Sequence, residues 1–165
     1  MEIVLLHPEI PQNTGSTARL AAAVDVRLHL VEPIGFSLDS KHLKRAGLDY
    51  WPDVEMLVHS NWDALERELQ SESPRELAER LRLFTARGVE SLFDVDFHAD
   101  DVLVFGCESK GLPEALLREH ASRRVCVPMR ESVRSLNLAN IVCLGTYAAL
   151  DRTGGLPKIG PAQES

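Results

Sequence analysis

The chain has 165 residues, of which 44% are hydrophobic and 26% charged, a composition typical of one globular domain and unlike that of a disordered chain. No apolar run is long enough to cross a bilayer and no basic leader precedes the first apolar stretch, so we expect a cytoplasmic protein with no membrane partner. The net charge of −7 disfavours a broadly basic nucleic-acid-binding surface, but the basic cluster KHLKRAG at residues 41–47 leaves phosphate binding open.

Two apolar segments near the start of the chain predict the first strands. EIVLLH (residues 2–7) and RLHLVEP (residues 27–33) are rich in Ile, Val and Leu. Between them, NTGSTARLAAAVD (residues 13–25) predicts an alanine-rich helix that is capped by Asn13 or Thr14. The order strand, helix, strand is typical of an α/β fold.

The middle of the chain repeats this alternation. MLVH (residues 56–59) predicts a third strand, and NWDALERELQ (residues 61–70) predicts a helix capped by Asn61. SPRELAERL (residues 73–81) predicts a second helix, because its serine can cap and its proline suits the first helical position. LRLFTARG (residues 81–88) then predicts a strand that runs into a turn.

The C-terminal half contains the most apolar strand. DVLVFG (residues 101–106) predicts a strand covered on both faces, followed by a helix at PEALLREH (residues 113–120). RRVCVPM (residues 123–129) predicts the last strand, and SVRSLNLANIVCLGTYAAL (residues 132–150) the last long helix. Strands separated by helices predict one α/β domain with a mostly parallel sheet flanked by helices, spanning residues 1–154, with a Gly- and Pro-bearing C-terminal tail at 155–165.

Ligands of parallel sheets bind outside the carboxyl ends of the strands. Four loops at such positions are rich in special residues: HPEIPQNTGSTAR (residues 7–19), TARG (85–88), FGCESKGLP (105–113) and VPMRESVRSLNLAN (127–140). Turn formation or helix capping explains each loop taken alone. Their joint occurrence instead favours one shared ligand site.

The start of the last helix carries more polar side chains than a cap requires. Arg134, Ser135, Asn137 and Asn140 all lie there, whereas one side chain suffices to cap a helix. The additional polar groups indicate that something besides the backbone is bound at this point.

Several common chemistries have no support in the sequence. There is no G-x-G-x-x-G, no phosphate-binding G-x-x-x-x-G-K-[ST], no G-x-S-x-G and no H-E-x-x-H. Cys107, Cys126 and Cys143 form no C-x-x-C pair, and the six histidines are scattered. We therefore expect neither a disulfide framework nor a metal site. His7, after the first strand, is a weaker catalytic candidate.

Three segments resemble the motifs of the SPOUT RNA 2′-O-ribose methyltransferases. They are PEIPQNTGSTARLAAA (residues 8–23), LVFGCESKGLP (103–113) and VPMRESVRSLNLANIVCLGTYAAL (127–150), in the family's order and over nearly the whole chain. In its compact length and in the segment VEPIGFSLDSKHLKRAGLDYW (31–51), the chain resembles one branch of this family. Members of that branch methylate the wobble nucleotide, cytidine or uridine 34, in the tRNA anticodon stem-loop. Cys107 stands where relatives often carry proline.

The resemblance implies a parallel sheet whose C-terminal segment is threaded into a deep trefoil knot, and a homodimer whose active site is completed by the partner chain. It implies S-adenosylmethionine as cofactor and no metal. The cofactor-binding residues it implies are Phe84, Thr85, Gly106, Glu108, Gly111, Val127, Met129, Ser135 and Leu136. The catalytic residues it implies are Arg19, Asn13, Glu108, Ser135 and Asn137, and those expected to contact RNA are Arg19, Lys44, Arg45 and Lys110.

The sequence leaves three alternative functions open. The chain could methylate another tRNA or rRNA position, because the catalytic motifs are shared across the family. It could be an RNA-binding module that keeps the fold without methyl transfer. The acidic pI of about 5.4 also fits an α/β enzyme acting on a small molecule, which would bind no tRNA at low salt.

Overall fold

The computed structural model describes residues 1–38 and 54–158. In chain order the strands are β1 (Glu2–Leu6), β2 (Arg27–Val31), β3 (Met56–His59), β4 (Leu81–Phe84), β5 (Glu90–Ser91), β6 (Val102–Phe105) and β7 (Arg124–Cys126). The helices are α1 (Pro11–Val24), α3 (Trp62–Ser71), α4 (Leu77–Arg80), α5 (Glu114–Glu119) and α6 (Leu138–Thr153), with a short 3-10 turn at Ala121–Arg123.

All strand pairings in the described residues are parallel, in the order β3-β2-β1-β6-β4-β7-β5. The predicted parallel α/β sheet is therefore confirmed. The central strands β1 and β6 are almost completely buried, as expected for strands covered on both faces. The knotted path of the C-terminal segment and the division into residues 1–154 and 155–165 stay predictions; α6 ends at Thr153.

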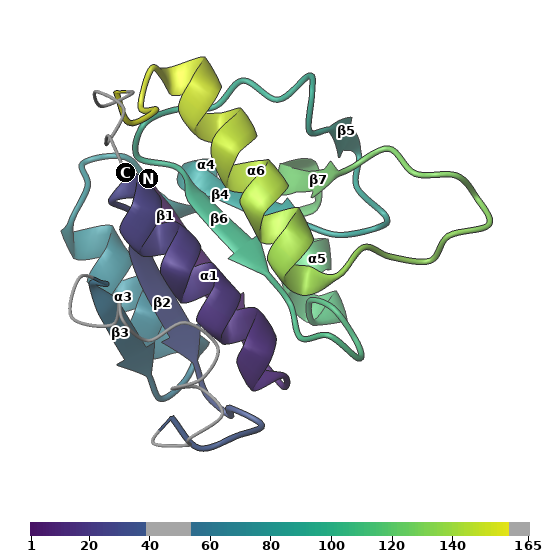
Figure 1. Cartoon of the computed structure of the whole chain (residues 1–165). Coiled ribbons are helices and arrows are strands. Elements are labelled where there is room, and N and C mark those ends of the chain that lie inside the picture. The colour runs from purple at the N-terminus through teal and green to yellow at the C-terminus, as the bar shows by residue number, and fades with distance from the viewer. Residues whose placement is uncertain (39–53, 159–165) are drawn as a thin grey trace, which may run out of the picture.

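Two hydrophobic layers flank the sheet. Helices α1 and α6 run side by side over one face (Figure 1) and bury Leu20, Val142 and Leu150 together with the sheet residues Ile3 and Leu103. The other face packs against α3, α4 and α5 through residues that include Leu65, Leu69, Leu77, Leu116 and Leu117. None of the described helices is long and apolar enough to cross a membrane.

The predicted start of the first helix is wrong. Helix α1 begins at Pro11, with Ile10 as a cap residue that makes no side-chain cap bond. Proline suits this position because its missing N–H would have no partner in the first turn. Asn13 and Thr14 are buried within the helix instead of preceding it. Their side chains are thus available for contacts other than capping.

Two further predicted helices differ in extent. Only Leu77–Arg80 of residues 73–81 is helical, because Ser73 accepts the N–H of Arg75 in a turn and Arg75 forms an ion pair with Asp100. The last helix begins at Leu138, so residues 132–137 lie outside it. Asn61 does cap α3, accepting the N–H of Ala64 at 2.9 Å. The two-residue strand β5 was not predicted.

Candidate functional site

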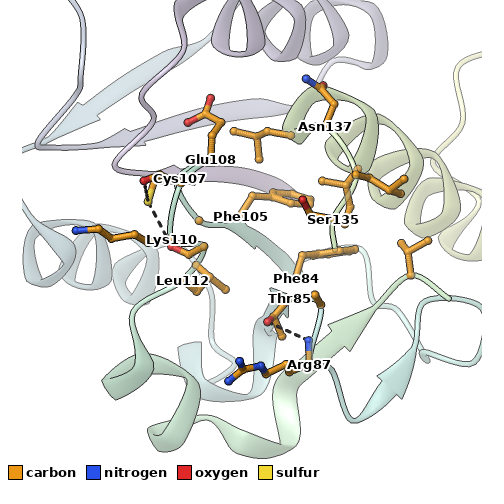
Figure 2. A pocket seen from close by; sticks show the side chains of 18 of the residues that line it. Phe84, Thr85, Arg87, Phe105, Cys107, Glu108, Lys110, Leu112, Ser135 and Asn137 are labelled. Atoms are coloured by element: carbon orange, nitrogen blue, oxygen red, sulfur yellow. Dashed lines mark hydrogen bonds between the residues drawn. The ribbon is translucent and has the colours of Figure 1, made fainter. Parts of the chain in front are cut away.

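A cavity of about 550 Å³ lies at the carboxyl ends of β4 and β6 and beside the residues that follow β7. Its apolar wall includes Phe84 and Phe105, whose stacked rings have centroids 4.4 Å apart. Figure 2 shows Glu108 and Asn137 at one side of this pocket and Arg87 at the opposite side. A pocket with an apolar wall and a few convergent polar groups is typical of a small-molecule site.

The loop after β6 approaches itself closely at Gly106. A Cβ atom placed there would lie 2.1 Å from the carbonyl carbon of Gly111 and 2.2 Å from the nitrogen of Leu112. A side chain at residue 106 is therefore excluded unless the loop moves. Gly111 has a φ of 71°, in the left-handed region that favours glycine. The two glycines fix the shape of the loop that forms one wall of the pocket.

Two carboxylates, one from this loop and one from the segment before α1, each accept hydrogen bonds from the other segment. Glu108 accepts the backbone N–H of Glu9 at 2.8 Å and that of Ile10 at 3.2 Å. In return, Glu9 accepts the N–H of Ser109 at 2.9 Å and its hydroxyl at 2.7 Å. These bonds from Ser109 hold the pKa of Glu9 below its ordinary value. We call these four hydrogen bonds, two accepted by each carboxylate, the Glu9–Glu108 latch.

A chain of amide side chains continues from the latch to α6. Asn13 donates to Oε1 of Glu108 at 2.9 Å, and Asn137 donates to Oδ1 of Asn13 at 3.0 Å. The other end of the Asn137 amide accepts the N–H of Asn140 at 3.3 Å and so caps α6. Asn137 therefore both caps the helix and joins the site, which accounts for part of the polar helix start.

The structure brings nearly all the predicted site residues together. The expected cofactor residues Phe84, Thr85, Gly106, Glu108, Gly111, Val127, Met129, Ser135 and Leu136 all line the pocket, as do Asn13, Asn137 and Lys110. Arg19 lies exposed on α1, outside the pocket lining. Lys44 and Arg45 lie outside the described residues.

Sequence reasoning assigned no role to Glu9, although it lies inside the first motif. Its partner Ser109 is 100 residues away, so no local pattern could have shown the contact. Leu138, Ile141, Val142 and Gly145 form an apolar stripe on one face of α6, and Leu138 and Ile141 also line the pocket. Gly145, from the same stripe, packs on Phe84: a Cβ atom there would lie 2.8 Å from its ring.

The sequence profile of the SpoU rRNA Methylase family matches residues 1–147. The chain belongs to this family. Proteins named tRNA (cytidine(34)-2′-O)-methyltransferase are similar to it: that of Polaromonas sp. (strain JS666 / ATCC BAA-500) is 46% identical over 92% of this chain and 90% of that protein. The protein of the same name from Burkholderia pseudomallei (strain 1106a) is 44% identical over 92% of this chain and 95% of that protein.

A solved structure described as giving insights into the 2′-OH methylation of C/U34 on tRNA superimposes with a TM-score of 0.83. It is 44% identical in sequence and covers 92% of this chain and 94% of that chain. Membership of the SpoU family confirms the resemblance drawn from the three motifs.

Proposed function

We propose that this SpoU family protein transfers a methyl group from S-adenosylmethionine to the ribose 2′-oxygen of nucleotide 34 of tRNA. The observation that carries the proposal is the meeting of the three motif loops at one cavity, where Asn13, Glu108 and Asn137 form a continuous hydrogen-bonded chain. The two similar proteins named above carry this activity in their names.

The residues of the pocket fit such a cofactor. The cavity of about 550 Å³ is within the usual size range of small-molecule sites. Phe84, Phe105 and Val127 offer apolar surface for an adenosine, and Ser135 and Glu108 offer polar groups. Gly106 and Gly111 both line the cavity, so the loop borders it without a side chain at these two positions.

The bound cofactor would supply a methyl group already activated by its sulfonium. The chain's own residues then have two tasks: positioning the ribose and stabilising charge while the hydroxyl proton leaves. Asn13 and Asn137 are held in place by each other and by Glu108, so they are preorganised for hydrogen bonding at the pocket edge. No metal is required for this transfer.

Arg19 is assigned to the ribose or an adjacent phosphate. Its guanidinium stays protonated in nearly any environment, so it stabilises charge and does not accept the proton. Because Arg19 is exposed on α1 and outside its own pocket lining, we assign it to the pocket of a partner chain in a homodimer. The adjacent exposed face of α6, which includes Tyr147, belongs to the same proposed interface.

Contacts to the RNA are assigned to three further basic side chains. Lys110 lines it and is placed to contact phosphate, which positions an RNA but does not read its bases. Lys44 and Arg45 are proposed for the same purpose. The reaction is placed in the cytoplasm.

Transfer of labelled methyl groups from S-adenosylmethionine to total RNA, in which the tRNA lacks 2′-O-methylation at position 34, tests the proposal. We expect label in the tRNA fraction. Cofactor binding without any label in tRNA would favour an RNA-binding module, and label in rRNA alone would favour another substrate within the family. Absence of cofactor binding would contradict the assignment of the pocket.

A further inference from the structure

A second cluster of chemically active side chains lies on the sheet face covered by α3. His29, in the middle of β2, is fully buried, and His59, the last residue of β3, is 5% exposed. His59 pairs with Val31 in the sheet register, so His29 lies two residues away on the same face. Their rings are stacked with centroids 5.1 Å apart. None of the pocket-lining residues belongs to this cluster.

The two rings form the centre of a chain between two carboxylates. His29 Nε2 lies 2.5 Å from Oε2 of Glu2, and His29 Nδ1 lies 2.9 Å from Nε2 of His59. Nδ1 of His59 then lies 3.6 Å from Oε2 of Glu68 on α3. The first two distances are those of hydrogen bonds, which need one ring proton each, whereas the third is longer than a hydrogen bond and is an ion-pair distance only.

Two neutral imidazoles carry two ring protons, which fill the two shorter contacts. The longer contact, between Nδ1 of His59 and the carboxylate of Glu68, then holds no proton. The set of contacts therefore lacks a positive charge between His59 and Glu68.

A divalent cation would complete this set. One ligand atom from each of His29, His59 and Glu68 lies within 4.8 Å of the other two. Zinc bound at about 2.0–2.1 Å holds its nitrogen ligands roughly 3.3 Å apart, close to the 2.9 Å between the two ring nitrogens. The carboxylate of Glu68 is 38% exposed and so has room to move toward the rings.

The surroundings of His29 match those of a metal-binding histidine. Such a histidine usually donates its second ring N–H to a carboxylate, which fixes the ring and its tautomer. Glu2 provides that carboxylate, and it is itself placed by Arg80, 3.4 Å from its Oε1. Burial also lowers the pKa of His59, which favours the neutral ring that metals require.

We propose that His29, His59 and Glu68 form a binding site for a divalent cation of the zinc class, with Glu2 orienting His29 from behind. The site joins the edge strand β3 and helix α3 to β2, three elements that lie together at one side of the molecule (Figure 1). Its role is structural, because the methyl transfer needs no metal. It fixes β3, the strand at one edge of the sheet, against β2 and α3.

Titration of the chelator-treated protein with Co²⁺, followed by calorimetry and visible absorption, tests the site. We expect one Co²⁺ per chain and absorption bands without a thiolate charge-transfer band, since the proposed ligands include no cysteine. His59→Gln should abolish this binding, and Glu68→Gln should weaken it by at least about tenfold. Glu66→Gln, which removes the same charge from the same helix, should leave it unchanged.

Because Glu68 is partly exposed, its variant keeps the test meaningful even if His59→Gln fails to fold. No Co²⁺ binding to the wild-type protein would overturn the proposal and leave the cluster as a hydrogen-bonded chain only. Binding that is unchanged in Glu68→Gln or in a folded His59→Gln would also overturn it.

Discussion

Asn13 and Asn137 are joined by a hydrogen bond of 3.0 Å between side chains that lie 124 residues apart in the chain. The bond connects the first turn of α1 to the cap of α6, and Asn13 extends it to Glu108 in the loop after β6. One buried amide thus holds together three of the segments that line the pocket. Its geometry determines how the pocket edge is presented to a substrate.

Replacing Asn13 by alanine should loosen all three segments. Asn13→Ala removes a donor from Glu108 and an acceptor from Asn137 at a side chain that is only 6% exposed. We expect the free energy of unfolding to fall by about 1–3 kcal/mol, together with a loss of cofactor affinity. Urea unfolding and calorimetry measure the two effects. Gln12→Ala, at an exposed position of the same helical turn, is the control and should change neither.

Gly106→Ala should lower cofactor affinity more than Gly111→Asn. In Gly106→Ala the new Cβ would lie 2.1 Å from the backbone of Gly111, so the loop must move. We expect a loss of stability of about 1–3 kcal/mol and cofactor affinity reduced roughly tenfold or more.

Gly111→Asn is the matched comparison. No atom lies within 4 Å of a Cβ at Gly111, and asparagine adopts the left-handed conformation more readily than other side chains. Cofactor affinity measured by calorimetry should therefore stay close to that of the wild type. Equal losses in the two variants would contradict the importance of the close approach at Gly106.

The Glu9–Glu108 latch should depend on pH. The bonds from Ser109 lower the pKa of Glu9 in the folded protein, so the carboxylate contributes stability above the ordinary glutamate pKa of about 4.3. That contribution is lost as the pH falls through the lowered pKa of the folded state. Glu9→Gln should therefore be less stable than the wild type at pH 7, with the difference shrinking toward pH 3.5.

Urea unfolding of both proteins across that pH range measures the difference. Glu119→Gln, exposed on α5, is the control and should show little difference at either end. A destabilisation by Glu9→Gln that is the same at pH 7 and pH 3.5 would contradict the role given to the charge of Glu9.

Arg19→Ala should separate catalysis from cofactor binding. Arg19 is exposed and outside the pocket lining, so we expect unchanged cofactor affinity. Methyl transfer should fall by at least about a hundredfold, as when one group that stabilises transition-state charge is removed. Arg67→Ala, at an exposed position of α3, should retain full activity. A hundredfold loss of cofactor affinity in Arg19→Ala would instead show that this side chain contacts the cofactor.

Mixing two inactive variants tests whether Arg19 serves the partner's pocket. Leu136→Glu puts a carboxylate into the pocket wall at a side chain that is 39% exposed, so the fold should survive. After the subunits exchange at random with those of Arg19→Ala, about half of the dimers are mixed, and one of the two sites in each mixed dimer combines an intact pocket with an intact arginine. The mixture should therefore regain about a quarter of wild-type activity. No recovery after verified exchange would show that the arginine acts within its own chain.

The sheet was predictable because its strands are continuous apolar runs. DVLVFG and EIVLLH are six-residue blocks of mostly Val, Ile, Leu and Phe that lie between polar segments. Such short blocks, rich in β-branched residues, are typical of the central strands of a covered sheet. The helix starts were less predictable. At residues 73–81 the ion pair of Arg75 with Asp100 favours turns over the expected helix, and such a tertiary contact leaves no local signal.

The candidate site was predictable as a set of loops but not as a network. The excess of polar groups at the start of α6 was visible in the sequence, whereas the bond from Asn137 to Asn13 depends on α1 and α6 lying side by side. The contact between Glu9 and Ser109 likewise depends on the sheet order that places β1 next to β6.

The histidines show the same limit most clearly. His29 and His59 are 30 residues apart and match no ligand spacing, so the sequence predicts no metal site. The parallel pairing of β2 with β3 is what brings their rings into contact.

The most direct test of the proposed function is the position of the methylated nucleotide in tRNA incubated with the wild-type protein and labelled S-adenosylmethionine. Digestion and mass spectrometry at nucleotide resolution identify it. We predict 2′-O-methylation of nucleotide 34, and no other new modification. Methylation at a different tRNA position, or a tRNA that stays unmodified while the protein binds the cofactor, would contradict it.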